Sequence, residues 1–108
     1  MASVKVEPGA ETIERDQLTP LYNVVLLDDN THTYDYVIEM LGKLFLFSEA
    51  EAYAHAVEVD KTGRTIVITC ELDHAEFARD QIRAYGPDWR MPESKGSMAA
   101  IIEPAAGE

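Results

Sequence analysis

The sequence has little cysteine, few basic residues and no long apolar run, and each shortage excludes a class of protein. Cys70 is the only cysteine, so the chain cannot contain an internal disulfide framework or a thiolate metal site. Residues 1–20 lack the apolar segment of a signal peptide, and no run approaches the roughly 20 apolar residues that cross a bilayer. We therefore expect a cytoplasmic protein that does not enter the membrane.

The shortage of basic residues also limits the partners. Nine lysines and arginines against 20 acidic residues give a formal net charge of −11, which repels nucleic-acid phosphates and anionic lipid surfaces. The same charge favours cationic ligands, including protonated amines. At 108 residues the chain is long enough for one domain with one core, which argues against a multidomain enzyme.

Composition divides the chain into a domain and two tails. Residues 1–20 are rich in Glu, Thr, Gly and Pro and cannot bury enough apolar surface to offset their ordering entropy, so we expect a flexible N-terminal tail. Residues 21–105 are expected to form the domain, and residues 106–108 a short C-terminal tail. No cofactor is implied.

Local signals predict the first half of the domain. The β-branched and leucine run Tyr22–Leu27 ends at turn-forming residues, as a buried strand does. Apolar side chains then recur at helical spacing from Tyr34 to Phe45, behind Thr33 as a candidate N-cap. Residues 48–51 (SEAE) form a capping box that opens a second helix, which should reach about Lys61.

The second half continues with a β-branched strand at residues 64–71, in which Cys70 is interpreted as a core residue on the same face as Ile66 and Ile68. Asp73 should then cap a helix that runs through Tyr85, and residues 98–103 form a last strand. The order is β-α-α-β-α-β. It predicts an α+β fold with a small three-stranded antiparallel sheet and helices packed on one face.

Three polar side chains follow the first strand and are the first candidates for chemistry: Asp28, Asp29 and Asn30. Adjacent carboxylates repel, so a protein that keeps both ionised usually supplies a cation such as a metal or an ammonium group. A turn and helix entry is an equally good interpretation. On the second helix, Ala56 and Asp60 lie on one face, which makes an apolar pocket with an acidic rim available.

At these residues the sequence resembles a known family. Residues 25–30 (VLLDDN) and 36–41 (YVIEML) are similar to the opening block of ClpS, the bacterial N-degron adaptor, and the resemblance runs without gaps from Tyr22 to about Tyr85. It implies a non-enzymatic protein that binds the free α-amine and hydrophobic first residue of an N-end rule substrate. It also implies delivery to a Clp AAA+ protease through the N-terminal domain of a ClpA- or ClpC-type unfoldase.

The resemblance assigns roles to individual positions. The family's amine-binding asparagine, aspartate and histidine fall on Asp28, Asp29 and Asp60, so the histidine is replaced by a carboxylate. The remaining positions of the implied pocket and its rim are Asn30, His32, Tyr34, Val37, Ala56, Val59 and Met98.

Several of these positions depart from the family. Tyr34 and Ala56 replace two methionines that gate the pocket, and Thr33 replaces a proline. For unfoldase docking, the family's acidic residue falls on Asp73, whereas its lysine falls on Ala78, beside Arg79.

Two other classes can be drawn from the acidic cluster. A strand that ends in Asp28-Asp29 also resembles the start of a signalling receiver domain, with Asp60 as phosphoacceptor, but a receiver needs five strand-helix units. A metal-binding or hydrolase site would need further ligands, and the three histidines, including His32, have no ligand spacing. His32 is interpreted as a turn or surface histidine.

Overall fold

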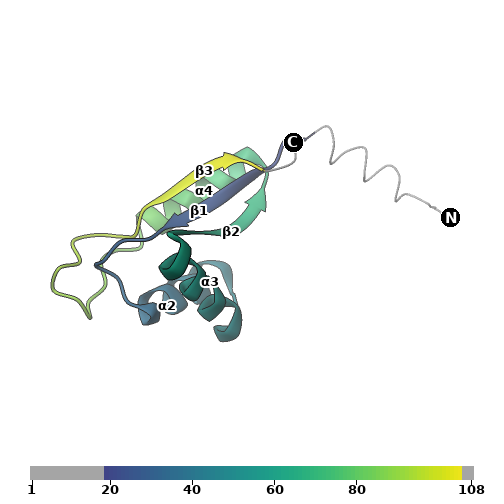
Figure 1. Cartoon of the computed structure of the whole chain (residues 1–108). Coiled ribbons are helices and arrows are strands. Elements are labelled where there is room, and N and C mark those ends of the chain that lie inside the picture. The colour runs from purple at the N-terminus through teal and green to yellow at the C-terminus, as the bar shows by residue number, and fades with distance from the viewer. Residues whose placement is uncertain (1–18, 106–108) are drawn as a thin grey trace.

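The computed structural model describes residues 19–105 and contains three strands and three helices in the predicted order (Figure 1). The elements are β1 (Tyr22–Leu27), α2 (Tyr34–Phe45), α3 (Glu49–Thr62), β2 (Arg64–Cys70), α4 (Leu72–Arg83) and β3 (Ala100–Pro104). Residues 1–18 and 106–108, which include most of both predicted tails, lie outside the described residues.

The sheet is antiparallel with the strand order β2-β1-β3, so β1 is the central strand. Strand β1 carries a continuous run of buried residues because neighbours cover it on both edges and α4 lies across one face (Figure 1). The α2–α3 pair packs beside β2. The predicted α+β fold is confirmed.

A bulge in β2 overturns the predicted face of that strand. Val24 pairs with Ile68 but Val25 pairs with Ile66, so Val67 is the extra residue. The side-chain alternation therefore reverses within the strand. Val67 and Ile68 both contact the core, whereas Ile66 lies on the open face, not on the face of Cys70.

One ion pair crosses the open face of the sheet. Arg64 pairs with Leu27 at one end of β1 and Glu103 pairs with Asn23 near the other, yet the Arg64 guanidinium lies 2.6 Å from the Glu103 carboxylate. The two side chains must pass over Val25 to meet. With the cross-strand neighbours Ile66 and Ile101, the ion pair accounts for the full burial of Val25, which lies outside the core cluster.

Caps fix the ends of the first two helices as predicted. The Thr33 side chain accepts a hydrogen bond from the Tyr36 N–H, and the Ser48–Glu51 capping box has both of its bonds. Helix α3 ends at Thr62, and its C-cap is Gly63, whose φ of 89° lies in the left-handed region that glycine adopts without strain.

The predicted start of α4 is wrong by two positions. The N-cap is Glu71, which makes no side-chain cap bond, and the Asp73 carboxylate accepts from the neighbouring His74 N–H instead. The helix also ends earlier than predicted, at Arg83, and the last strand begins at Ala100 rather than residue 98. None of the helices in residues 19–105 combines the length and apolarity that spanning a bilayer requires.

Candidate functional site

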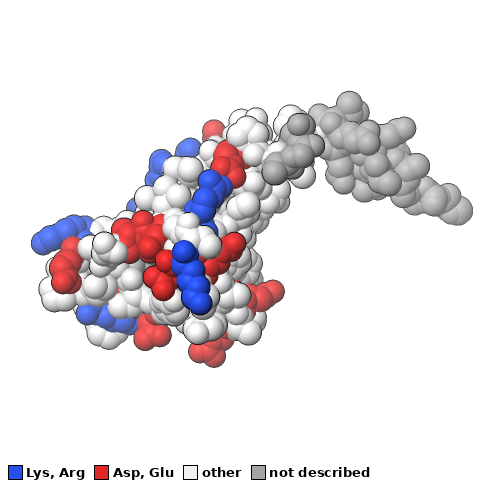
Figure 2. All heavy atoms as spheres, in the orientation of Figure 1, with Lys and Arg blue, Asp and Glu red and all other residues white. Residues whose placement is uncertain are grey.

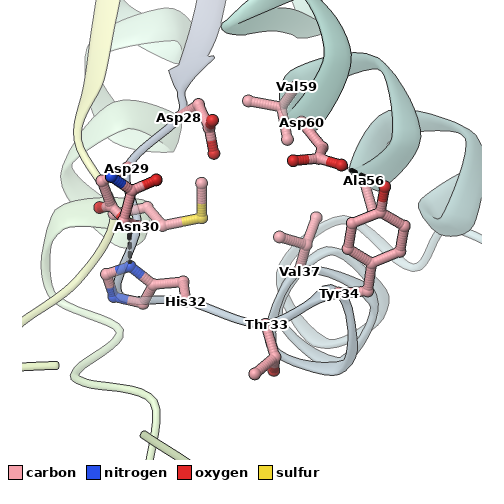
Figure 3. Close-up of a pocket in the computed structure, with 11 residues that line it drawn as sticks. Asp28, Asp29, Asn30, His32, Thr33, Tyr34, Val37, Ala56, Val59 and Asp60 are labelled. Carbon is pink, nitrogen blue, oxygen red and sulfur yellow. Dashed lines mark hydrogen bonds and ion pairs between the residues drawn. The ribbon is translucent and has the colours of Figure 1, made fainter. Parts of the chain in front are cut away.

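A pocket with a cavity volume of about 170 Å³ lies where the end of β1, the start of α2 and the end of α3 converge (Figure 3). The structure brings all ten sequence-predicted pocket residues to it, together with Thr33. The lining is Asp28, Asp29, Asn30, His32, Thr33, Tyr34, Val37, Ala56, Val59, Asp60 and Met98.

The walls of the pocket are apolar. Val37, Ala56, Val59 and Met98 each expose at most 3% of their surface and come from α2, α3 and the segment before β3. Figure 3 shows Val37 and Val59 pointing into the pocket from the side opposite Asp29 and Asn30. An aliphatic side chain inserted here would lose its contact with water on several sides.

The carboxylates of Asp28 and Asp60 face one another at the mouth of the pocket (Figure 3). Asp28 is held there because its N–H donates to the Gly63 carbonyl oxygen (3.0 Å), which extends the β1–β2 pairing by one residue. Partial loss of hydration, with the negative charges of Asp60 and Asp29, raises the pKa of Asp28. Figure 2 shows acidic side chains gathered where β1 approaches α3.

The Asp29 carboxylate is hydrogen-bonded to neighbouring residues of the protein. Its Oδ1 accepts from the N–H and hydroxyl of Thr31 (3.0 and 3.2 Å) and lies 2.7 Å from Nδ1 of His32. Partial burial alone would raise the pKa of Asp29, but the bonds from His32 and Thr31 outweigh it and hold the pKa below its usual range.

His32 is a pocket residue whose environment the sequence did not reveal. It lies in the turn between β1 and α2, as one of the two interpretations had it, but its side chain is 3% exposed, so the other interpretation, a surface histidine, is wrong. Its Nε2 lies 2.7 Å from the Gly96 carbonyl oxygen and 3.1 Å from the Ser94 hydroxyl. The ring thus connects the loop after β1 to the segment that leads to Met98.

A hydrogen bond closes one side of the pocket mouth. The Tyr34 hydroxyl donates to Asp60 at 2.6 Å, which links the start of α2 to the end of α3. This bond, with the local negative charge, raises the pKa of Tyr34 to about 12, so the phenol stays protonated. Asp60 therefore has one carboxylate oxygen engaged, and the other is available at the mouth.

Asp88 holds the pocket residue Thr33 in place but does not itself line the pocket. It was not identified from the sequence. Its buried carboxylate accepts from the N–H and the hydroxyl of Thr33, both at 2.8 Å, and from Arg90 at 3.0 Å. Burial alone would raise the pKa of Asp88, but these bonds lower it to about 2. Asp88 thereby fixes the residue that precedes Tyr34.

The two predicted docking residues do not lie together. Asp73 lines a second, shallower hollow beside Glu71 and Glu76, next to the first described residues of the chain. Arg79 does not line it, and its guanidinium lies 3.1 Å from Asp80.

Fold and pocket together define a small α+β binding domain whose site suits a ligand with one cationic and one apolar group. Within residues 19–105, no cluster of three or more His, Cys, Asp and Glu side chains could hold a metal ion. The antiparallel three-stranded sheet also differs from the doubly wound parallel sheet of a receiver domain.

Comparison with known proteins identifies the family. The family model of the ATP-dependent Clp protease adaptor protein ClpS matches residues 17–92. The ClpS adaptor of Gloeobacter violaceus is 34% identical over 82 residues, covering 71% of this chain and 88% of the relative. That of a Synechococcus strain is 29% identical over 77 residues, covering 70% and 85%.

A solved structure has the same fold. Agrobacterium tumefaciens ClpS2 bound to L-phenylalaninamide superposes with a TM-score of 0.69 at 24% identity, covering 81% of this chain and all but 1% of the other. The chain belongs to the ClpS family of Clp protease adaptors. These proteins are adaptors rather than enzymes.

Proposed function

We propose that this protein binds the free α-amine and the hydrophobic first side chain of N-degron proteins and delivers them to a Clp AAA+ protease. The observation that carries the proposal is the apolar pocket with the Asp28 and Asp60 carboxylates facing one another at its mouth. Membership in the ClpS family and the amino-acid amide bound by A. tumefaciens ClpS2 support it.

The charges suit an α-ammonium group, which is a compact cation with three N–H donors. Asp28 and the free oxygen of Asp60 supply acceptors and negative potential at the mouth. Asp29 lines the same pocket, but one of its oxygens is already bonded to Thr31 and His32. The pKa of Asp28 is raised by partial loss of hydration and, to a smaller extent, by repulsion from Asp60 and Asp29, and a bound cation would relieve that repulsion.

The shape of the pocket supports a preference for Leu, Ile and Val as the first residue. Ala56 is fully buried in the wall where the family has a methionine, which leaves space for a side chain branched at Cβ. Tyr34 is fixed over the mouth by its bond to Asp60 and shortens the space for large aromatic rings.

Ala56→Met should remove the acceptance of first residues that are branched at Cβ. The longer side chain refills the wall, so peptides that begin with Ile or Val should lose about 1.5–3 kcal/mol of binding free energy, while a Leu peptide loses less. Ala54→Met on the exposed side of α3 is the matched control. Titrations of peptides that differ only in their first residue measure the effect. If native protein binds Phe best and rejects Ile, the preference is wrong.

For the partner, we propose the N-terminal domain of a ClpA- or ClpC-type unfoldase. Asp73 is the residue carried over from the family, and the hollow beside it offers three carboxylates and the half-exposed Leu72. This surface lies on α4, away from the pocket lining. Substrate binding and docking therefore use separate surfaces.

Deleting residues 1–18 should separate these two functions. The lining that the structure describes lies between Asp28 and Met98, so peptide affinity should stay within about twofold of the full chain. Degradation of an N-degron substrate by the cognate unfoldase and protease should be strongly slowed. Peptide titration and a degradation assay on the same preparation give both numbers. A large loss of peptide affinity would place the tail in the pocket.

A peptide set tests the proposed function as a whole. Peptides of one sequence, with the first residue varied and the α-amine either free or acetylated, are titrated against the native protein. The proposal requires binding that depends on both the free amine and a hydrophobic first residue. Binding that ignores the first residue would contradict it.

A further inference from the structure

We propose that His32 is a positioning residue of the pocket: at neutral pH both ring nitrogens carry a proton, and the imidazolium ties Asp29 to the backbone at Gly96. The inference deepens the proposed function, because it says which charges remain for the ligand. The protonation of the ring is a property of the free protein and does not depend on the proposed function.

The acceptors around the ring determine its protonation. Nδ1 lies 2.7 Å from Oδ1 of Asp29, and Nε2 lies 2.7 Å from the Gly96 carbonyl oxygen. A neutral imidazole has one N–H and one lone pair, so one of these contacts would set a lone pair against an acceptor. Only the imidazolium donates in both directions.

Neighbouring hydroxyls do not remove this requirement. The Ser94 hydroxyl lies 3.1 Å from Nε2, but a single proton donated to Nε2 would leave the closer Gly96 oxygen facing a lone pair. On the other side, Oδ1 of Asp29 already accepts two bonds from Thr31, as an ionised carboxylate does. The proton between Asp29 and His32 therefore belongs to the ring.

The surroundings of the ring are compatible with a buried cation. From the loop after β1 it faces the Asp29 carboxylate, and from α2 the Tyr36 ring, whose centroid is 4.5 Å away. From the segment before β3 it faces Ser94 and Gly96. The charged neighbours in that segment point elsewhere: Asp88 binds Thr33 and Arg90, while Glu93 and Lys95 are exposed.

Two consequences follow for the pocket. The charge of Asp29 is compensated within the protein, so Asp28 and Asp60 carry the uncompensated charge that faces a ligand. The bond to Gly96 also fixes the backbone two residues before Met98, which forms part of the apolar wall. His32 thus controls both the charge and the wall of the pocket without being an acceptor for the amine.

A nuclear magnetic resonance measurement on the free full-length protein tests the protonation. With nitrogen-labelled histidine, the two-bond nitrogen–hydrogen spectrum distinguishes an imidazolium from either neutral tautomer, and His32→Gln assigns the signal. The expected result at neutral pH is two protonated nitrogens on His32. A neutral tautomer there would overturn the proposal.

Variants then test the positioning. Gln can replace only one of the two bonds, so His32→Gln should weaken binding of a Leu peptide about tenfold at neutral pH. It should also shift the methyl signal of Met98. His55→Gln is the matched control, because the His55 ring bonds to Thr65 and does not line the pocket.

The comparison of His32→Gln with His55→Gln at one neutral pH separates positioning from a general effect of losing a histidine. An unchanged peptide affinity together with an unchanged Met98 signal in His32→Gln would overturn the proposal. If no peptide binds, the proposed function fails, and the histidine and Met98 signals still decide the role of His32.

Discussion

Asp88→Ala should lower the free energy of unfolding by about 3 kcal/mol, because four donor groups on Thr33 and Arg90 lose their acceptor inside the protein. The carboxylate is fully buried and accepts from the N–H and hydroxyl of Thr33 and from Arg90. Thr33 caps α2, so the variant should also loosen Tyr34 at the pocket mouth. Denaturant unfolding followed by circular dichroism measures the loss.

The Asp88 carboxylate should also make the free energy of unfolding depend on pH. Its pKa of about 2 lies below the usual value of 3.8, so the native state favours the ionised form. Its contribution of about 2 kcal/mol is complete above the unfolded pKa and is lost as pH falls through the folded pKa. The difference in stability between native protein and Asp88→Ala should therefore narrow as pH falls below about 4.

Asp80→Ala is the matched control for both measurements. Asp80 is an exposed aspartate whose pairing with Arg79 lies at the surface, so its removal should change stability by less than about 1 kcal/mol. If Asp88→Ala were no more destabilising than this control, Asp88 would not be the support of α2 that its bonds indicate.

The parts of the fold that sequence predicted correctly depend on contacts between near neighbours. The Thr33 cap and the Ser48–Glu51 box join residues three positions apart, and the aliphatic run of β1 is buried whatever its partners are. The face shared by Ala56 and Asp60 follows from the helical period alone. Such features are available from the local sequence.

The missed features depend on distant partners. Asp88 meets Thr33 across 55 positions, and His32 meets Gly96 across 64, so no spacing rule could have joined them. The bulge at Val67 is set by the pairing of β2 with β1, and the β-branched sequence of β2 gives no indication of it. At α4 the local signal was misleading, since Asp73 lies inside the first turn and Glu71 precedes it.

Acetylating the α-amine of a Leu peptide should weaken its binding by about 2–5 kcal/mol, the effect of removing one partner of a hydrogen-bonded charge pair that is buried once the peptide covers it. Acetylation removes the positive charge and two of the N–H donors while leaving the side chain unchanged. The Asp28 and Asp60 carboxylates would then face an uncharged amide at the mouth. The loss should be smaller in high salt, because both carboxylates are exposed in the free protein and salt screens their attraction for the arriving amine.

Acid should have a related effect on the free-amine peptide. Asp28 has a raised pKa, so it is protonated early as pH falls, and a neutral acid attracts an ammonium weakly. Binding of the cation favours the ionised carboxylate, so affinity must fall as pH falls through the carboxyl range. The peptide amine stays protonated throughout, which makes the protein carboxylates the source of the change.

Calorimetric titration of the native protein with one Leu peptide in its free and acetylated forms tests the central claim most directly. The account requires the free form to bind more tightly by about 30-fold to several thousandfold, with no such difference when the modified amine is a lysine side chain further along the peptide. Equal affinity for the two forms would mean that the acidic pocket does not bind an α-amine.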